Sequence, residues 1–202
     1  MSFIDILKKR RSIYALGRNI SNEEEVIKTI KEAVKHSPTA FNAQTHRAKI
    51  LLGAAQDKFW GELVPTALTS TMKEQGADDA AIAATMTKLA GFKAAYGTVL
   101  FYEDESVTNK LKADFPLFAD NFDGWSEQST GIASANTWSA LTELGLGGNL
   151  QHYNPVIDEL VAKEFNIPDG YKLRGQLVFG SIEDSARDKA FLGDEILTEV
   201  IK

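Results

Sequence analysis

The chain has 202 residues, of which 44% are hydrophobic and 25% charged, so it has enough apolar material to bury the core of one compact domain. It contains no cysteine, which excludes disulfides, thiol nucleophiles and thiolate metal sites, and its three histidines make a zinc enzyme an unfavoured class. The formal net charge of −6 argues against nucleic acid or an anionic membrane as the main partner.

No apolar run reaches the roughly 20 residues that a membrane-spanning helix needs. The N-terminus is also unlike a signal peptide, because charged residues 8–11 stand where the apolar core of such a peptide should lie. No repeat or flexible linker divides the sequence. We therefore expect a cytoplasmic protein made of a single domain over residues 1–202.

Apolar residues at helical spacing predict a short helix from Phe3 to Leu7, which ends in the basic segment 8–11 and Ser12. Four cations followed by a hydroxyl suit a bound anion, because the planar arginine side chain presents a fork of donors to phosphate. When this segment is taken alone, a basic helix C-terminus favoured by the helix dipole is the simpler explanation.

A second helix is expected to begin at Ser21 or Asn22 and to end near His36. A polar loop follows and leads into a short strand over residues 48–53. Residues 56–94 have a helical pattern with one glycine-marked break.

The polar loop over residues 37–47 is the segment around which we expect the functional site to form. Pro38 restricts its backbone, and the carboxamides of Asn42 and Gln44 supply donors and acceptors for the edges of a flat heteroaromatic ring. A rigid polar loop at the end of a sheet is a favourable place for a planar cofactor. A helix-to-strand connection rich in turn-forming residues is an equally good interpretation of the loop alone.

Residues 96–102 are a near-continuous run of strand-forming residues and are predicted to be a buried central strand. Glu103 and Glu105 close this strand. Paired carboxylates can serve acid–base chemistry, but we interpret these two as a solvated strand end, since the sequence places nothing nearby that would raise either pKa.

A helix over residues 107–115 is interrupted by Pro116, and a long helix is predicted over residues 124–144. Its apolar face is predicted to carry Trp125, Ile132, Ala135, Trp138, Leu141 and Leu144. Small side chains are dense in this helix, which allows the close approach of another helix or of a second subunit. The glycines of residues 145–148 are expected to stop the helix. Residues 149–155 then form either a plain turn or a loop whose backbone N–H groups approach a ligand.

The C-terminal part is predicted to hold a helix over residues 156–165 and a buried strand over residues 172–180. A polar segment with Arg187 and Lys189 follows. Residues 195–201 have the character of a terminal strand that is able to pair with the sheet of another subunit. Few strands separated by many helices indicate an α+β protein in three layers, with helices on both sides of a sheet.

Four segments, in this order, resemble those of the FMN-dependent nitroreductase family. They are Arg10-Arg11-Ser12, residues 37–44 (Ser-Pro-Thr-Ala-Phe-Asn-Ala-Gln), residues 145–155, and Phe179-Gly180 with Lys189 further on. Residues 150–155 (Leu-Gln-His-Tyr-Asn-Pro) are typical of the small branch that includes the yeast fatty-acid-repression-mutant protein and copper-induced bacterial relatives. The resemblance covers nearly the whole chain.

The resemblance implies a nitroreductase-like α/β/α sandwich whose central, mainly antiparallel sheet is flanked by helices. It implies a homodimer in which the C-terminal strand is exchanged with the partner subunit and FMN binds at the subunit interface. By position, the FMN phosphate would be bound by Arg10, Arg11 and Lys189, with Ser12 beside them. Arg187 is a rival to Lys189 in this role.

The resemblance also assigns the remaining cofactor contacts. Asn42 and Gln44 would meet the pyrimidine edge of the flavin or its ribityl chain. The flavin of the other subunit would be reached by Ser37, Pro38 and Thr39. The segment after the glycines would supply Asn149, Leu150 and Gln151, the last two against the ring face opposite the substrate.

The activity implied by the resemblance is reduction of nitroaromatic or quinone-like acceptors by NADH or NADPH, through ping-pong hydride transfer at flavin N5, with no catalytic side chain and no metal. Two other classes are compatible with the sequence. One is a flavin-binding regulatory or stress-response protein with little turnover, and the other is a helix-rich interaction protein without a cofactor. The sequence departs from the wider family at Thr45 and His46, which stand where proline and an aromatic are common, and Arg47 follows them.

Overall fold

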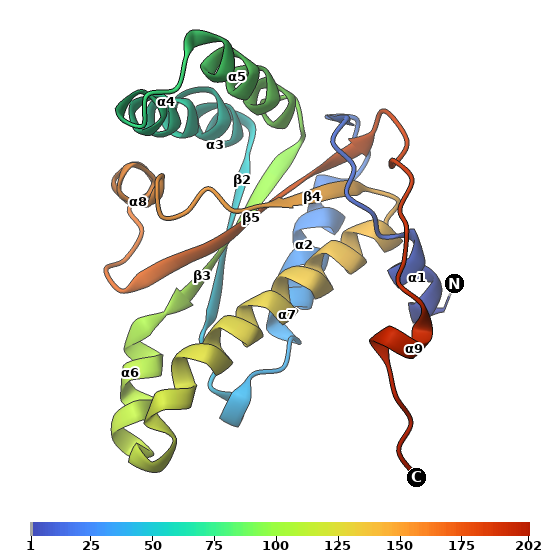
Figure 1. The fold of residues 1–202 in the computed structure, drawn as a ribbon, viewed down its shortest axis with the longest axis vertical. Coiled ribbons are helices and arrows are strands. Elements are labelled where there is room, and N and C mark those ends of the chain that lie inside the picture. The colour runs from blue at the N-terminus through green and yellow to red at the C-terminus, as the bar shows by residue number, and fades with distance from the viewer. Residues whose placement is uncertain (1) are drawn as a thin grey trace.

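The computed structural model describes residues 2–202, which form a mixed helix and sheet structure (Figure 1). All of its strand pairs are antiparallel, and the strand order is β1-β5-β3-β2, with β4 pairing with β5 as well. The strands are β1 (Leu16–Gly17), β2 (His46–Leu52), β3 (Gly97–Asp104), β4 (Gly147–Gln151) and β5 (Tyr171–Ile182).

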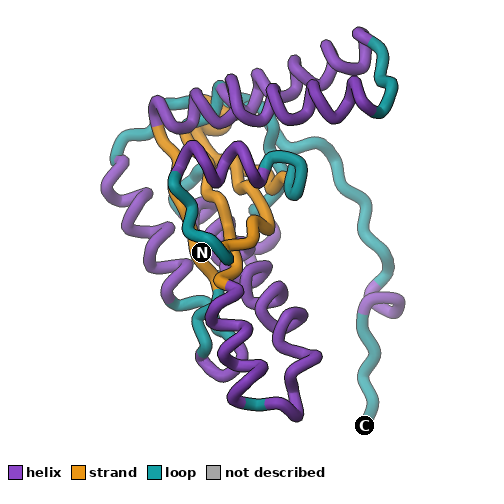
Figure 2. The backbone as a smooth tube through the Cα atoms, turned by 90° about the vertical axis from the view of Figure 1, so that its left-hand side faces the viewer, coloured by secondary structure: helices purple, strands orange, loops and turns teal. Residues whose placement is uncertain are grey.

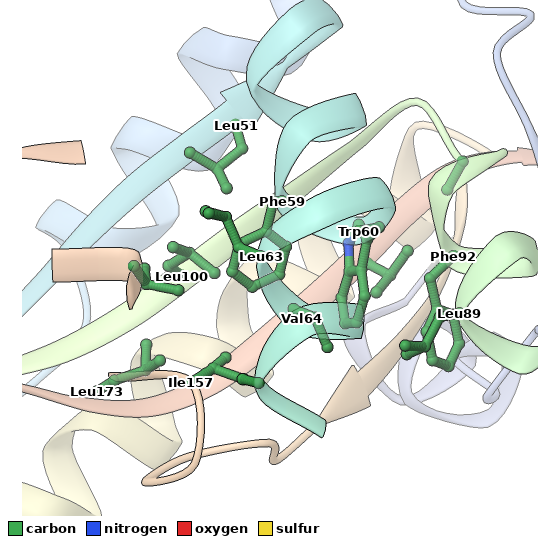
Figure 3. Close-up of a cluster of buried hydrophobic side chains, with 14 of the residues drawn as sticks. Leu51, Phe59, Trp60, Leu63, Val64, Leu89, Phe92, Leu100, Ile157 and Leu173 are labelled. Carbon is green, nitrogen blue, oxygen red and sulfur yellow. The ribbon is translucent and has the colours of Figure 1, made fainter. Parts of the chain in front are cut away.

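The strand β3 is the centre of the sheet, as predicted, and all of its residues are buried. Its side chains alternate between two hydrophobic clusters, because successive residues of a strand point to opposite faces. Leu100 and Tyr102 belong to one cluster, and Val99 and Phe101 belong to the other. The first cluster, shown in Figure 3, is dominated by large side chains such as Phe59.

Helices cover both faces of the sheet, which gives the three layers expected from the sequence (Figure 2). On one face lie α3 (Gly53–Lys58), a π-helical turn (Phe59–Leu63), α4 (Val64–Glu74), α5 (Asp79–Lys93) and α8 (Asp158–Phe165). On the other lie α2 (Glu23–Lys35) and the long α7 (Phe122–Glu143), with α1 (Phe3–Lys9) beside α7. The helix α6 (Glu105–Asp114) and a 3₁₀ segment (Pro116–Asn121) connect β3 to α7.

Side chains cap the helices where the sequence suggests. The Asn22 side chain accepts a hydrogen bond from the N–H of Glu25 at 3.1 Å and begins α2. The Asp78 side chain accepts from the N–H of Ala81 at 2.7 Å and begins α5 after the break.

The buried face of α7 agrees with the predicted one at Trp138 and Leu141 but differs from it elsewhere. Ile132 is 39% exposed and Ala135 is also exposed, whereas small residues such as Thr130, Ala133 and Thr137 are buried against the sheet. The buried hydroxyls of Thr130 and Thr137 are satisfied inside the helix, since Thr130 Oγ1 donates to the carbonyl of Ser126 at 3.1 Å and Thr137 Oγ1 donates to the carbonyl of Ala133 at 2.8 Å. The helix therefore packs closely on the sheet through small side chains, and its larger apolar residue at position 132 faces outwards.

The strand β4 lies where the sequence analysis expected a turn. Residues 147–151 pair with β5 in the register Gly148↔Phe179 and Leu150↔Leu177. Glycine and asparagine are poor strand formers, so propensity gave no sign of this strand. Tertiary packing decides the conformation here.

The predicted terminal strand is wrong within this chain, because residues 194–197 form the short helix α9 (Asp194–Leu197) and residues 198–202 form no strand. Two acidic residues in the first turn favour a helix start, and no strand of the described chain pairs with this segment. The C-terminal segment runs apart from the body of the molecule (Figure 2), and its apolar side chains, such as Val200 at 80%, are highly exposed. Within residues 2–202, no helix combines the length and the apolar character needed to cross a membrane.

Candidate functional site

Residues from the two ends of the chain meet in a basic cavity of about 250 Å³. Its lining is Arg10, Arg11, Ser12, Tyr14, Arg187, Asp188 and Lys189. The Arg11 guanidinium donates a hydrogen bond to the backbone carbonyl of Arg187, which ties the two segments together. The structure therefore brings together all four residues predicted from this region and also includes Arg187, the rival to Lys189.

The segment that carries Arg10 and Arg11 is fixed to the strand β4. Ser12 forms a bridge with Gly148, and the N–H of Ile13 donates to the carbonyl of Gly148 at 2.9 Å. The fully buried side chain of Asn149 donates to the carbonyl of Ile13 at 2.8 Å and accepts from Gln151 Nε2 at 2.8 Å. Asn149 and Gln151 thus lock the basic segment onto β4 through their side chains.

Leu150 lines a separate, smaller cavity of about 170 Å³ between α7 and the sheet, together with His152 and Arg174. The ion pair between Arg174 and Glu103, at 3.0 Å, stands beside this cavity. Glu103 is only 4% exposed, and burial raises its pKa, although the hydrogen bond from Arg174 opposes this shift. The prediction of a solvated strand end is therefore wrong for Glu103, whose partner lies 71 residues away in the sequence.

The loop over residues 37–47 has an unusual backbone. Phe41, Asn42 and Gln44 have φ values of 57°, 51° and 52°, a left-handed conformation that non-glycine residues rarely adopt. Hydrogen bonds hold the loop in this shape, among them one from the N–H of Gln44 to Thr39 Oγ1 at 2.9 Å. Ser37 anchors its start, since its buried hydroxyl accepts from Asn136 Nδ2 of α7 at 2.9 Å.

Arg47 closes the other end of the loop. Its guanidinium donates to the carbonyl of Gln44 at 2.6 Å, to the Asp104 carboxylate at 2.8 Å and to the Tyr171 hydroxyl at 3.1 Å. These contacts hold the end of the loop in its shape.

An apolar cavity of about 380 Å³ adjoins this loop. Its lining is Pro38, Thr39, Ala40, Phe41, Trp125, Gln128, Ser129 and Ile132. The Phe41 ring is the centre of an aromatic cluster, with centroid distances of 5.2 Å to Phe115, 5.8 Å to Phe122 and 6.2 Å to Trp125. This cluster was not predicted, although residues 115, 118, 122 and 125 are spaced by three or four positions, which is a signal for one aromatic face of a helix.

The predicted site residues therefore form two groups in one chain. The basic residues and β4 lie at one end of α7, where Arg10 contacts Trp138. Ser37 contacts Asn136 of α7, whereas Pro38 and Thr39 lie further towards the N-terminus of that helix, near Ser129. The two groups line different cavities.

The sequence and the fold of this chain were compared with those of known proteins, and the matches define its family. Residues 7–181 match the model of the Nitroreductase family. The nitroreductase CinD from Lactococcus lactis, solved in complexes with chloramphenicol, nicotinic acid and 4-nitrophenol, is 57% identical over the whole of both chains, with a TM-score of 0.92 for the chloramphenicol complex. The fold is thus the nitroreductase-like fold.

Two Saccharomyces cerevisiae proteins are also similar over nearly their whole length. HBN1 is 34% identical over 198 residues, and FRM2 is 31% identical over 201 residues, with 96% of this chain and 95% of each relative covered. A nitroreductase from Desulfitobacterium hafniense with bound FMN shares the fold at a TM-score of 0.71 and 16% identity, covering all of both chains. The chain belongs to the nitroreductase family, which supports an oxidoreductase function. The predicted resemblance, including the branch, is confirmed.

Proposed function

We propose that this protein is an FMN-dependent oxidoreductase that uses NADH or NADPH to reduce nitroaromatic or quinone-like acceptors. The observation that carries this proposal is the basic cavity, in which Arg10, Arg11 and Lys189 gather although the chain has a net charge of −6. Such a local concentration of cations in an acidic protein is typical of a site for a phosphate group.

The residues present fit the FMN phosphate. A phosphate monoester offers several strong acceptors and a charge between −1.5 and −2 at neutral pH. Arg10, Arg11 and Lys189 supply charged donors, Ser12 supplies a hydroxyl, and Asp188 is the one carboxylate in the lining. This donor set is a match for phosphate in both charge and hydrogen-bond capacity.

When bound, FMN would supply the hydride chemistry, accepting a hydride from the nicotinamide donor and passing electrons to the acceptor. The chain's own residues would bind and orient it. Asn42 and Gln44 offer carboxamides to the polar edge of the ring, and Leu150 and Gln151 would support one face. Asn149 acts indirectly, since its side chain is committed to Ile13 and Gln151.

The apolar cavity beside the loop suits a planar aromatic acceptor. Phe41 and Trp125 supply ring surfaces, and Pro38 and Thr39, both predicted to reach the flavin, line the same space. The complexes of CinD with chloramphenicol and 4-nitrophenol support nitroaromatics as the ligand class, and the complex with nicotinic acid supports a pyridine ring of the nicotinamide type.

We also propose that the chain acts as one flavin-binding domain in a homodimer with FMN at the subunit interface. The outer edge of β2 has no strand neighbour in residues 2–202, and an open edge favours pairing with another chain. The exposed apolar tail, with Ile201 at 87%, would find cover there as the exchanged C-terminal segment. A second copy would also bring the loop group of one chain next to the basic group of the other.

The test is an absorbance spectrum of the purified protein followed by anaerobic addition of NADH, and of NADPH in a parallel sample. We expect a flavin spectrum that one or both donors bleach and that chloramphenicol or a benzoquinone restores. A protein without flavin that also takes up no added FMN would overturn the proposal. A bound flavin that neither donor reduces would overturn the enzymatic part of it and favour a flavin-binding regulator.

A further inference from the structure

We propose that Trp138, which was not among the predicted site residues, is a positioning residue of the basic cavity. Its ring face holds the Arg10 guanidinium in place. The inference rests on the proposed function, because it assigns Trp138 a role in binding the FMN phosphate. It concerns how the site is built and adds no step to the reaction.

The contact itself is close. The guanidinium carbon of Arg10 lies 4.5 Å from the centroid of the Trp138 ring, well within the roughly 6 Å over which a cation is attracted to an aromatic face. Trp138 is only 9% exposed and lies on α7, next to the sheet. A ring that is buried in this way is a rigid support for a flexible arginine side chain.

Arg10 differs from Arg11, Arg47 and Arg174 in what it does with its donors. Arg11, Arg47 and Arg174 all donate hydrogen bonds to protein carbonyls or carboxylates. Within residues 2–202, the Arg10 side chain makes no ion pair and donates no hydrogen bond. Stacking on Trp138 fixes its guanidinium without using any N–H group, so the donors stay available for a phosphate.

The indole N–H gives a second, independent observation. Trp138 Nε1 is buried and has no hydrogen-bond partner in the described chain, whereas Trp60 Nε1 donates to Thr98 Oγ1 at 2.7 Å. Nε1 lies against Gly148, where an added Cβ would be only 3.2 Å from it. The indole N–H of Trp138 therefore does not hold the ring in place. The ring face is the part of Trp138 that contacts Arg10, and the N–H is unpaired near Gly148, to which the basic segment is attached.

The experiment measures the affinity of apoprotein variants for FMN and for riboflavin, which lacks the phosphate, by quenching of flavin fluorescence. We expect Trp138→Leu to weaken FMN binding about tenfold, a value between those of exposed and desolvated cation–π contacts because Arg10 is half-buried, and to leave riboflavin binding unchanged. Trp138→Phe, which keeps a weaker ring face and is the safer variant for folding, should weaken FMN binding about threefold. Trp60→Phe, the matched control, removes a buried indole elsewhere and should leave both affinities unchanged.

A double-mutant cycle with Arg10→Ala separates a positioning role from a general loss of packing. If Trp138 acts through Arg10, Trp138→Leu will cost little further FMN affinity once Arg10 is alanine. Equal loss of FMN and riboflavin affinity, or full additivity with Arg10→Ala, would overturn the inference while leaving the proposed function intact. If the wild-type apoprotein binds no FMN, both the proposed function and this inference fail.

Discussion

Arg47 and Asp104 form an ion pair, with 2.8 Å between Nη2 and Oδ2, that joins the polar loop to the N-cap of α6. Each partner also organises its own segment. Arg47 donates to the carbonyl of Gln44, and Asp104 caps α6 by accepting from the N–H of Ser106 at 3.1 Å. The left-handed backbone of the loop is therefore held from outside by a contact between residues 57 positions apart.

Arg47→Lys should lower the free energy of unfolding by about 1–3 kcal/mol, because a lysine ammonium cannot reproduce the planar fork that reaches Gln44, Asp104 and Tyr171 together. Urea denaturation measures this change. Arg18→Lys is the matched control, since the Arg18–Asp57 pair is more exposed, with side chains 44% and 43% accessible, and should change stability by less than about 1 kcal/mol. Equal losses in the two variants would contradict a special role for Arg47.

Asn149→Ala should destabilise the protein by about 1–3 kcal/mol, because it leaves the buried carbonyl of Ile13 and the amide of Gln151 without their partner. It should also weaken FMN binding, since the basic segment loses its attachment to β4. Thermal denaturation and an FMN titration measure the two effects. Asn19→Ala, at an exposed position, should leave the stability nearly unchanged. A loss of stability as large as that of Asn149→Ala would contradict the stabilising role of the Asn149 hydrogen bonds.

His46 makes the stability of the folded protein depend on pH. Burial lowers its pKa; the hydrogen bond to the carbonyl of Val34 opposes this shift, and nearby Arg47 adds to it. His46 of the unfolded chain, whose ordinary pKa is near 6.5, therefore takes up its proton at a higher pH than His46 of the folded protein. The stability that His46 contributes is complete above that pH and is lost as the pH falls towards the lowered pKa of the folded state.

His46→Gln keeps a donor for Val34 but cannot take up a proton. The variant should lose less stability than the wild type between pH 7.5 and pH 5.5, with a difference in slope of at most about 1.4 kcal/mol per pH unit. Urea denaturation across that range provides the measurement. Identical slopes for the two proteins would show that His46 is not the group responsible.

Trp125→Ala should raise the dissociation constant for 4-nitrophenol about tenfold, since the ring that packs beside Phe41 in the cavity lining is removed. The measurement is the spectral change of the flavin-loaded protein on titration. Leu117→Ala removes an apolar side chain that is 84% exposed in the neighbouring segment and should leave the constant unchanged. An unchanged constant for Trp125→Ala would place the acceptor elsewhere.

Elements with strong local signals were predictable from the sequence. The central strand β3 is a continuous apolar run, and the caps Asn22 and Asp78 have the residue types that begin helices. The strand β4 was not predictable, because its Gly-Gly-Asn start is stabilised only by pairing with β5. The opposite holds for the C-terminal tail: its apolar residues indicate a strand, but a strand is stable only when it is paired, and no strand of the described chain pairs with this segment.

The same division applies to the candidate site. Arg10, Arg11 and Ser12 were found because charge and motif lie together in the sequence. The ion pair of buried Glu103 with Arg174 and the stacking of Arg10 on Trp138 join residues that are distant in the sequence. Local sequence patterns do not predict such contacts. The loop residues with left-handed backbone, such as Phe41, are not glycines, so their residue types gave no sign of this conformation.

The central claim is that the cavity containing Arg10 binds the phosphate of FMN. The most direct measurement is the affinity of the apoprotein for FMN and for riboflavin, in the wild type and in Arg10→Ala. The account predicts that the wild type strongly prefers FMN and that Arg10→Ala loses about 1–3 kcal/mol of FMN binding while its affinity for riboflavin stays the same. Equal binding of FMN and riboflavin by the wild type would contradict it.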